Sequence, residues 1–318
     1  MRKITVIGGG TGTYTLLKGL KYYDVDLTAI VTTADSGGSS GQLRDEFGVL
    51  PPGDLRRCLV ALSEKRGDVW RQIFEYRFNG EQEKNNLGNL IITALVKLTG
   101  DLPRAIDVVS DLLEVNGRVL PATLDNVHLC AKLEDGQIVV GESNIDIPKH
   151  NSKLKIREVY LEPQAHAYKD ATKAIMNSDL VIMGPGDLYT SIIPNLLVEG
   201  IPQALKATSA KVYYVCNVMT KHGETSGFTA KDFILEIQKY SGHVLDGVIC
   251  NSKEPSPELA EIYSQEQSYF VRPNVQGDSK KVIKEDLIEE NPEAYEKGKK
   301  RPLIRHDSKK LAKIIVTI

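Results

Sequence analysis

The chain has 318 residues, enough for one large α/β domain or two small ones. Its 40 Lys and Arg residues against 42 Asp and Glu residues give a formal net charge of −2, so no global basic field attracts nucleic acid or an anionic membrane. No apolar run reaches the length of a membrane span, and the four cysteines lack metal-site or disulfide spacing. We therefore expect a cytoplasmic protein with reduced thiols that neither binds nucleic acid nor inserts into a membrane.

The chain opens with a short apolar run, a glycine-rich turn and a helical pattern. Ile4, Val6 and Ile7 suit a buried strand, and apolar residues recur at helical spacing over 16–20. Amides at the start of such a helix point at an anion and carry the positive end of the helix dipole. The pattern favours anion binding over a turn that binds nothing, and the candidate ligand contacts are Gly9, Gly10, Thr11, Gly12 and Thr13. It is not a Rossmann fingerprint, because Thr13 stands where the third glycine belongs, and it is not a P-loop.

A second strand is predicted over residues 27–33, so residues 4–33 form a βαβ unit and imply a parallel sheet. This strand leads into a Ser/Gly run over 35–41, at the carboxyl edge of the sheet, where open α/β folds bind ligands. Asp35 could hold sugar or ribose hydroxyls there, or it could merely cap the loop. A Ser/Gly run by itself is typical of an exposed loop, but its position makes Asp35, Ser36, Gly37 and Ser39 candidate ligand contacts.

Further elements follow from periodicity and turn signals. Helical spacing predicts a helical subdomain over about 44–115, and two strands turned at Asp135-Gly136 predict a β-hairpin over about 127–140 that adds antiparallel strands to the sheet. Parallel strands return at 180–183 and 211–215, and a charged C-terminal segment over about 280–305 is expected to be helical. The predicted fold is a single α/β domain over 1–318, with a Rossmann-like, doubly wound, mostly parallel sheet.

A second glycine turn follows the strand at 180–183. It again precedes an apolar helical pattern, so glycine backbone and hydroxyl side chains could approach phosphate oxygens at a helix start. The candidate contacts are Gly184, Gly186, Asp187, Leu188, Tyr189, Thr190 and Ser191. Two such turns can face one crevice, and together they suit a ligand with a diphosphate.

Polar side chains beyond these turns have less specific signals. Asn195 lies one helical turn past Ser191, and spacing alone does not decide between a ligand contact and an ordinary exposed residue. Asn217 closes the strand at 211–215 and should emerge at the carboxyl edge of the sheet. Asp54 follows a Pro-Pro-Gly turn and is expected to cap its own helix. His222 is solitary, which favours a surface histidine over a metal ligand or general base.

Six segments together resemble the gluconeogenesis factor family, the uridine-diphosphate-sugar-binding relatives of 2-phospho-L-lactate transferase. Each glycine turn alone is unspecific, but the combination spans nearly the whole chain in order. The segments are Gly8–Gly12, Ala34–Gly41, Pro51–Arg56, Leu87–Leu90, Gly184–Ser191 and Arg305–Asp307.

The resemblance implies a transferase-type Rossmann-like fold, with the two glycine turns around the ligand phosphates and Asp35 toward the sugar or acceptor. It also implies a role in central carbon use, cell-wall precursor supply and cell shape, and makes Arg305 a candidate ligand contact. Two departures limit the transfer of roles. The transferases carry paired acidic residues after the second strand, where this chain has only Asp35, and Asn85-Asn86 replaces a stretch that usually includes a histidine.

Three functions remain open from the sequence. The leading hypothesis is a binding protein that senses UDP-N-acetylglucosamine or a related nucleotide sugar and reports to a regulatory partner protein, with no catalytic residue and no certain cofactor. The second is a transferase that moves a phosphoryl-linked group to a hydroxyl acceptor, with Asp35 holding Mg²⁺ or activating the acceptor. The third, a nicotinamide-dependent oxidoreductase, rests on the βαβ unit and Asp35 alone. The oligomeric state, including a homodimer, is not fixed.

Overall fold

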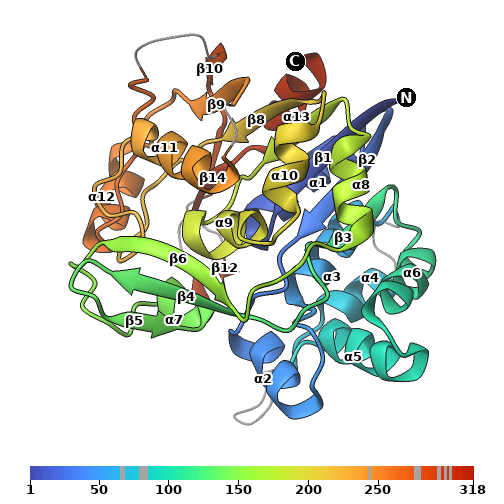
Figure 1. Ribbon diagram of the computed structural model, residues 1–318. Helices are drawn as coiled ribbons and strands as arrows, with labels where there is room; N and C mark the ends of the chain where they lie inside the picture. Colours follow the sequence, from blue (N-terminus) through green and yellow to red (C-terminus); the bar gives the residue numbers. More distant parts are fainter. Residues whose placement is uncertain are drawn as a thin grey trace.

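The protein is described by a computed structural model over residues 1–64, 69–78, 85–242, 245–275, 281–291, 295–296, 299–300 and 303–318. A seven-stranded sheet with the order β10-β9-β8-β7-β1-β2-β3 forms its centre, and all neighbouring strands are parallel (Figure 1). These strands are β1 (Arg2–Gly8), β2 (Val25–Val31), β3 (Arg118–Pro121), β7 (Leu180–Met183), β8 (Lys211–Val215), β9 (Gly247–Asn251) and β10 (Lys281–Glu285). The predicted doubly wound, mostly parallel sheet is confirmed.

The strand order places a switch point between β1 and β7. From β1 the chain moves outward through β2 to β3 on one side, and from β7 it moves outward through β8 and β9 to β10 on the other. Ligands of open α/β sheets bind outside the carboxyl ends of the strands at such a point. Both glycine turns follow these two strands, so the topology alone brings them to the same place.

Helices cover both faces of the sheet. On one face, α1 (Gly10–Leu20), α3 (Gly53–Leu62) and α13 (Ser308–Thr317) bury their apolar sides against alternate residues of β1 and β2. On the other face, α8 (Lys169–Met176), α9 (Ile193–Leu196), α10 (Ile201–Ala207) and α11 (Ala230–Ser241) pack in a second core. The alternation follows from the two-residue period of a strand, which directs Val6 to the first core and Ile7 to the second.

The region predicted to be helical contains α2 (Gly38–Phe47), α3, α4 (Val69–Glu75), α5 (Leu87–Thr99) and α6 (Leu102–Leu113). Side-chain caps start two of these helices: Asn86 accepts from Asn89 N–H, and Asp101 accepts from Arg104 N–H. One expectation differs at the Ser/Gly run. Helix α2 begins at Gly38, so the second half of the run is helical and not an open loop.

The two predicted hairpin strands are present, but they do not join the large sheet as expected. Strands β4 (His128–Leu133) and β5 (Ile138–Val140) pair across Asp135-Gly136, but with β6 (Ile156–Glu162) they form a separate antiparallel sheet in the order β5-β4-β6. This small sheet buries one side against the second core instead of extending the large sheet. A short helix, α7 (Glu142–Asp146), follows β5 and lies beside the small sheet (Figure 1).

The expectation of helix near the C-terminus is wrong for the described part of 280–305. After α12 (Pro257–Gln265), β10 joins the edge of the large sheet, and β11 (Ile288–Asn291) pairs with β14 (Leu303–His306). Two short strands, β12 (Tyr295–Glu296) and β13 (Lys299–Lys300), also pair. Sheet pairing and burial of apolar residues such as Leu287 override the helix propensity of the charged residues. Across the described ranges, no helix has the length and apolar character to span a bilayer.

Candidate functional site

The two glycine turns lie against each other at the carboxyl ends of β1 and β7. A Cβ built at Gly12 would lie 2.4 Å from the carbonyl oxygen of Pro185, so only glycine permits this approach. Thr13 Oγ1 donates to the same carbonyl at 3.4 Å, and a Cβ at Gly10 would lie 3.1 Å from Ser191 Oγ. The backbone of one turn is therefore in direct contact with the backbone and hydroxyls of the other.

Asn195 fastens the two turns together from inside the protein. Its side chain is fully buried, and Nδ2 lies within hydrogen-bond distance of the carbonyl oxygens of Gly8, Ser191 and Ile192, at 3.2, 2.9 and 3.2 Å. The NH2 group of this amide is thus occupied by backbone of both turns, which gives Asn195 a structural role, whereas its Oδ1 is buried without a hydrogen-bond partner among the described residues.

The second turn continues into a short π-helix, η1 (Leu188–Ile192), which then passes into α9. Leu188 and Tyr189 are buried in the core, so at these two positions only the backbone could meet a ligand. Asn217 supports the turn from the end of β8, because its Nδ2 donates to Gly186 O at 2.9 Å and its Oδ1 accepts from Tyr214 O–H at 3.0 Å.

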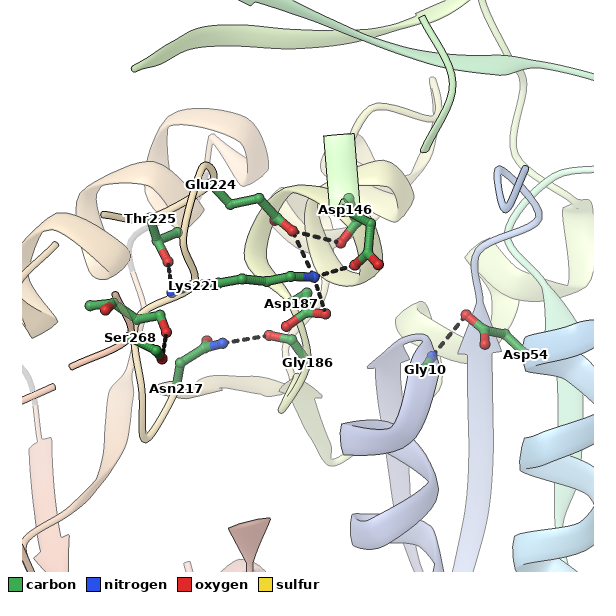
Figure 2. A network of polar contacts seen from close by, with 12 residues as sticks. Gly10, Asp54, Asp146, Gly186, Asp187, Asn217, Lys221, Glu224, Thr225 and Ser268 are labelled. Atoms are coloured by element: carbon green, nitrogen blue, oxygen red, sulfur yellow. Dashed lines mark hydrogen bonds and ion pairs between the residues drawn. The ribbon is translucent and has the colours of Figure 1, made fainter. Parts of the chain in front are cut away.

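A lysine surrounded by three carboxylates borders the second turn (Figure 2). Lys221 Nζ lies 2.8 Å from both Asp187 Oδ2 and Glu224 Oε1, and it also contacts Asp146 of α7. The three carboxylates come close enough together to surround one cation, and the ammonium group takes that position. Burial lowers the pKa of Lys221, but Glu224, Asp187 and Asp146 outweigh it and raise the pKa.

Glu224 is the buried member of this group. Its side chain is fully shielded from solvent, and burial raises the pKa of its carboxyl to about 7, against the opposing effect of Lys221. Lys221 thus ties the start of η1, through Asp187, to α7 and to its own loop. The sequence placed residues 220–225 at this edge of the sheet but gave no signal for the ion pairs, because Asp146 and Asp187 are far from Lys221 in the chain.

A second group of carboxylates borders the first turn. Asp35 accepts from Gly37 N–H at 2.7 Å through Oδ1, and Glu142 of α7 lies near the same glycine, with Oε2 3.6 Å from the position of a Cβ there. Burial, and next the charges of Asp35, Asp146 and Asp54, raise the pKa of Glu142 to about 9. Sequence reasoning missed Glu142, since it follows a hairpin strand with no motif around it.

Asp54 lies between this group and the first turn. The sequence predicted that Asp54 caps its own helix, α3. Instead, Gly10 N–H donates to Asp54 Oδ2 at 2.8 Å, so the side chain caps α1. Burial, with the charge of Asp35 second, raises the pKa of Asp54 to about 6, while Arg57, Gly10 and Arg56 oppose the shift.

The other serines predicted after the second strand serve packing between elements. Ser36 Oγ accepts from Ser143 N–H at 3.0 Å, which joins the loop to α7. Ser39 is buried and donates to Asn85 Oδ1 at 3.0 Å, which joins α2 to the start of α5. The charge of Asp35 acts on Asp54, which contacts the first turn, whereas Ser39 joins α2 to the helical layer.

Arg305 lies on β14, where its cross-strand neighbour is Glu289 of β11. The next residue, His306, is buried and hydrogen-bonded to the backbone of Cys216, at the end of β8. Burial lowers the pKa of His306 to about 4, and the bond to Cys216 only partly opposes this. Strand β14 therefore passes by the carboxyl edge of the sheet, although Arg305 and the first glycine turn come from opposite ends of the chain.

This fold and its paired glycine turns define a class of CofD-like α/β proteins. The family model described as 2-phospho-L-lactate transferase CofD matches residues 4–288, and the chain belongs to that family. It is 43% identical to a putative gluconeogenesis factor of Thermotoga maritima, over 99% of both chains. It is 40% identical to the gluconeogenesis factor of Bacillus subtilis, over 99% of this chain and 98% of that one.

Solved structures agree with this assignment. A crystal structure of a Bacillus halodurans protein superposes with a TM-score of 0.90 at 38% identity and covers 99% of each chain. Another crystal structure from the same organism, described as a member of the UPF0052 family, gives a TM-score of 0.89 at 38% identity, over 99% of this chain and all of that one. The resemblance inferred from six sequence segments is therefore confirmed for the family and the fold.

Proposed function

We propose that the protein is a cytoplasmic regulator that binds a nucleotide diphosphate sugar, UDP-N-acetylglucosamine or a close relative. The observation that carries this proposal is the contact between the two glycine turns at the switch point of the sheet. Each turn starts a helical segment whose first amides are positive, and two adjacent sites of this kind match the two phosphates of one diphosphate.

The regulatory part of the proposal rests on the relatives. Proteins called gluconeogenesis factors match this chain over nearly its whole length, and the name describes an effect on carbon metabolism. We propose that the ligand-bound state signals to a partner protein and links central carbon use to cell-wall synthesis and cell shape.

Calorimetry with the purified chain tests ligand binding. UDP-N-acetylglucosamine should bind, UDP should bind more weakly, and the sugar alone should not bind. The Gly12→Ala variant provides a matched control, since its new methyl group would push the two turns apart. Absence of binding by every nucleotide diphosphate sugar at millimolar concentration would contradict the proposal.

A transferase is the second candidate, and the carboxylates beside the first turn favour it. Asp35 and Glu142 both approach Gly37, so α7 supplies an acidic partner for Asp35 that the sequence after the second strand lacks. Carboxylate oxygens are the ligands that Mg²⁺ prefers, and Mg²⁺ would neutralise charge on the phosphates. Phosphorus NMR of a nucleotide sugar with Mg²⁺ and hydroxyl acceptors distinguishes the candidates, because an unchanged spectrum after long incubation leaves binding alone.

A further inference from the structure

The first glycine turn already holds an anion, which is a side chain of the protein itself. Asp54 Oδ2 accepts the hydrogen bond of Gly10 N–H at 2.8 Å, and the same oxygen would lie 2.7 Å from a Cβ at Gly9. The side chain is only 14% exposed, so it is packed against the turn. Asp54 thus takes the position that a ligand phosphate would need at the start of α1.

A second partner for this carboxylate lies on the same helix. Arg57 Nη1 is 3.6 Å from Asp54 Oδ1, one helical turn further along α3, and the Arg57 side chain is 38% exposed. Rotation of the carboxylate toward Arg57 would free Gly10 N–H and keep the negative charge compensated. In the structure one carboxylate oxygen holds the turn while the other faces the arginine, so loss of the bond to Gly10 would leave the carboxylate beside Arg57.

We propose that Asp54 is a built-in competitor of the ligand phosphate, which must displace it from Gly10 toward Arg57. This inference rests on the proposed nucleotide-sugar function and adds a specific change on binding. An anion held by one turn alone gains little against the carboxylate, whereas a diphosphate held by both turns gains enough contacts to displace it. Because Arg57 is partly exposed, displacement also changes the charge that α3 presents to a partner.

The Asp54→Asn variant tests the competition. It keeps an oxygen that can accept from Gly10 N–H but removes the negative charge. Calorimetry without divalent cations should show that inorganic pyrophosphate and UDP bind about tenfold more tightly to this variant, because the phosphate no longer opposes a charged hydrogen-bond acceptor. Asp101→Asn is the matched control, since Asp101 caps α6 through Arg104 N–H and should leave both affinities unchanged. Equal or weaker binding by Asp54→Asn would overturn the inference.

A measurement on the unaltered chain avoids any effect of the substitution on folding. In NMR spectra, pyrophosphate should shift both the Gly10 amide signal and the Asp54 carboxylate carbon signal. Binding that leaves either signal in place would overturn the role of Asp54 while the proposed function stands. If neither the unaltered chain nor the Asp54→Asn variant binds pyrophosphate, UDP or UDP-N-acetylglucosamine, both proposals are contradicted.

Discussion

Lys221 and Glu224 lie three residues apart in one loop, and Nζ of the lysine is 2.8 Å from a carboxylate that is shielded from solvent. The same ammonium group contacts Asp187 at the start of η1 and Asp146 on α7. A single positive charge therefore holds three segments that are distant in the sequence. Each of these segments borders the second glycine turn or faces it.

Replacement of Lys221 by Met should destabilise the protein strongly. The variant leaves three neighbouring carboxylates without a counterion, one of them buried, and loss of one partner of such a group costs about 3 kcal/mol. Urea unfolding measures the change. Lys173→Met is the control, because its pair with Asp170 is exposed on both sides and should be worth less than about 1 kcal/mol. Similar losses in both variants would contradict a special role for Lys221.

Gly12→Ala should weaken ligand binding, whereas a control variant that is also destabilised should bind the ligand normally. The new methyl group meets the carbonyl of Pro185 at 2.4 Å, and relief of this overlap separates the turns at a cost of about 1–3 kcal/mol. Gly136→Ala is the control, since it strains the β4–β5 turn at φ +89° but has open space around it. Calorimetry and urea unfolding on both variants compare the two effects. Equal affinity in the two variants would argue against a ligand at the junction of the turns.

Glu142→Gln should stabilise the protein near neutral pH. The pKa of Glu142 is about 9 in the folded chain and 4.5 as its ordinary value, so its contribution to stability is complete below 4.5 and is lost as pH rises toward 9. Glutamine does not titrate, so at neutral pH the variant should be more stable by about 3 kcal/mol. Urea unfolding across this range should show the two curves converge at low pH. A constant difference between them would contradict the raised pKa.

His306 should make stability fall on acidification. Its pKa is about 4 when folded and 6.5 as its ordinary value, so its contribution is present above 6.5 and is lost as pH falls toward 4. The loss should approach about 3 kcal/mol across this window, and His306→Gln should remove that part of the pH dependence. His128→Gln, at an exposed position on β4, is the control. The measurement is the unfolding free energy at several pH values. If the unaltered chain and His306→Gln showed the same slope against pH, His306 would already be charged in the folded chain and the prediction would be wrong.

The apolar runs and turn signals of the sequence were sufficient for four strands of the large sheet, β1, β2, β7 and β8, whereas β3 and β9 were not predicted and β10 lies where helix was expected. Val6 and Ile7 could be assigned to a buried strand because apolar side chains on both faces indicate a covered parallel sheet, and the glycine turns marked where strands end. The pairing of Asp135-Gly136 was also predictable. The placement of this hairpin in a separate small sheet was not predictable, because a hairpin signal is local and does not say which core the strands will cover.

The acidic surroundings of the turns could not be predicted from the sequence. Glu142 and Asp146 reach the site only because the small sheet places α7 beside both turns, and Asp54 reaches Gly10 from another helix. Similarly, β14 forms because β11 offers a neighbour, whereas the charged residues around it suggested helix. Contacts between distant segments carry no periodic signal, so they appear only when the chain is folded.

Helix α7 presents one end to each acidic group, with Glu142 near Asp35 and Asp146 on Lys221. Both residues belong to five consecutive positions that β5 anchors to the small sheet. Any tilt of that sheet would consequently move the carboxylates beside both glycine turns together. A partner protein that binds the small sheet from outside would therefore change the charge around both glycine turns without contacting them.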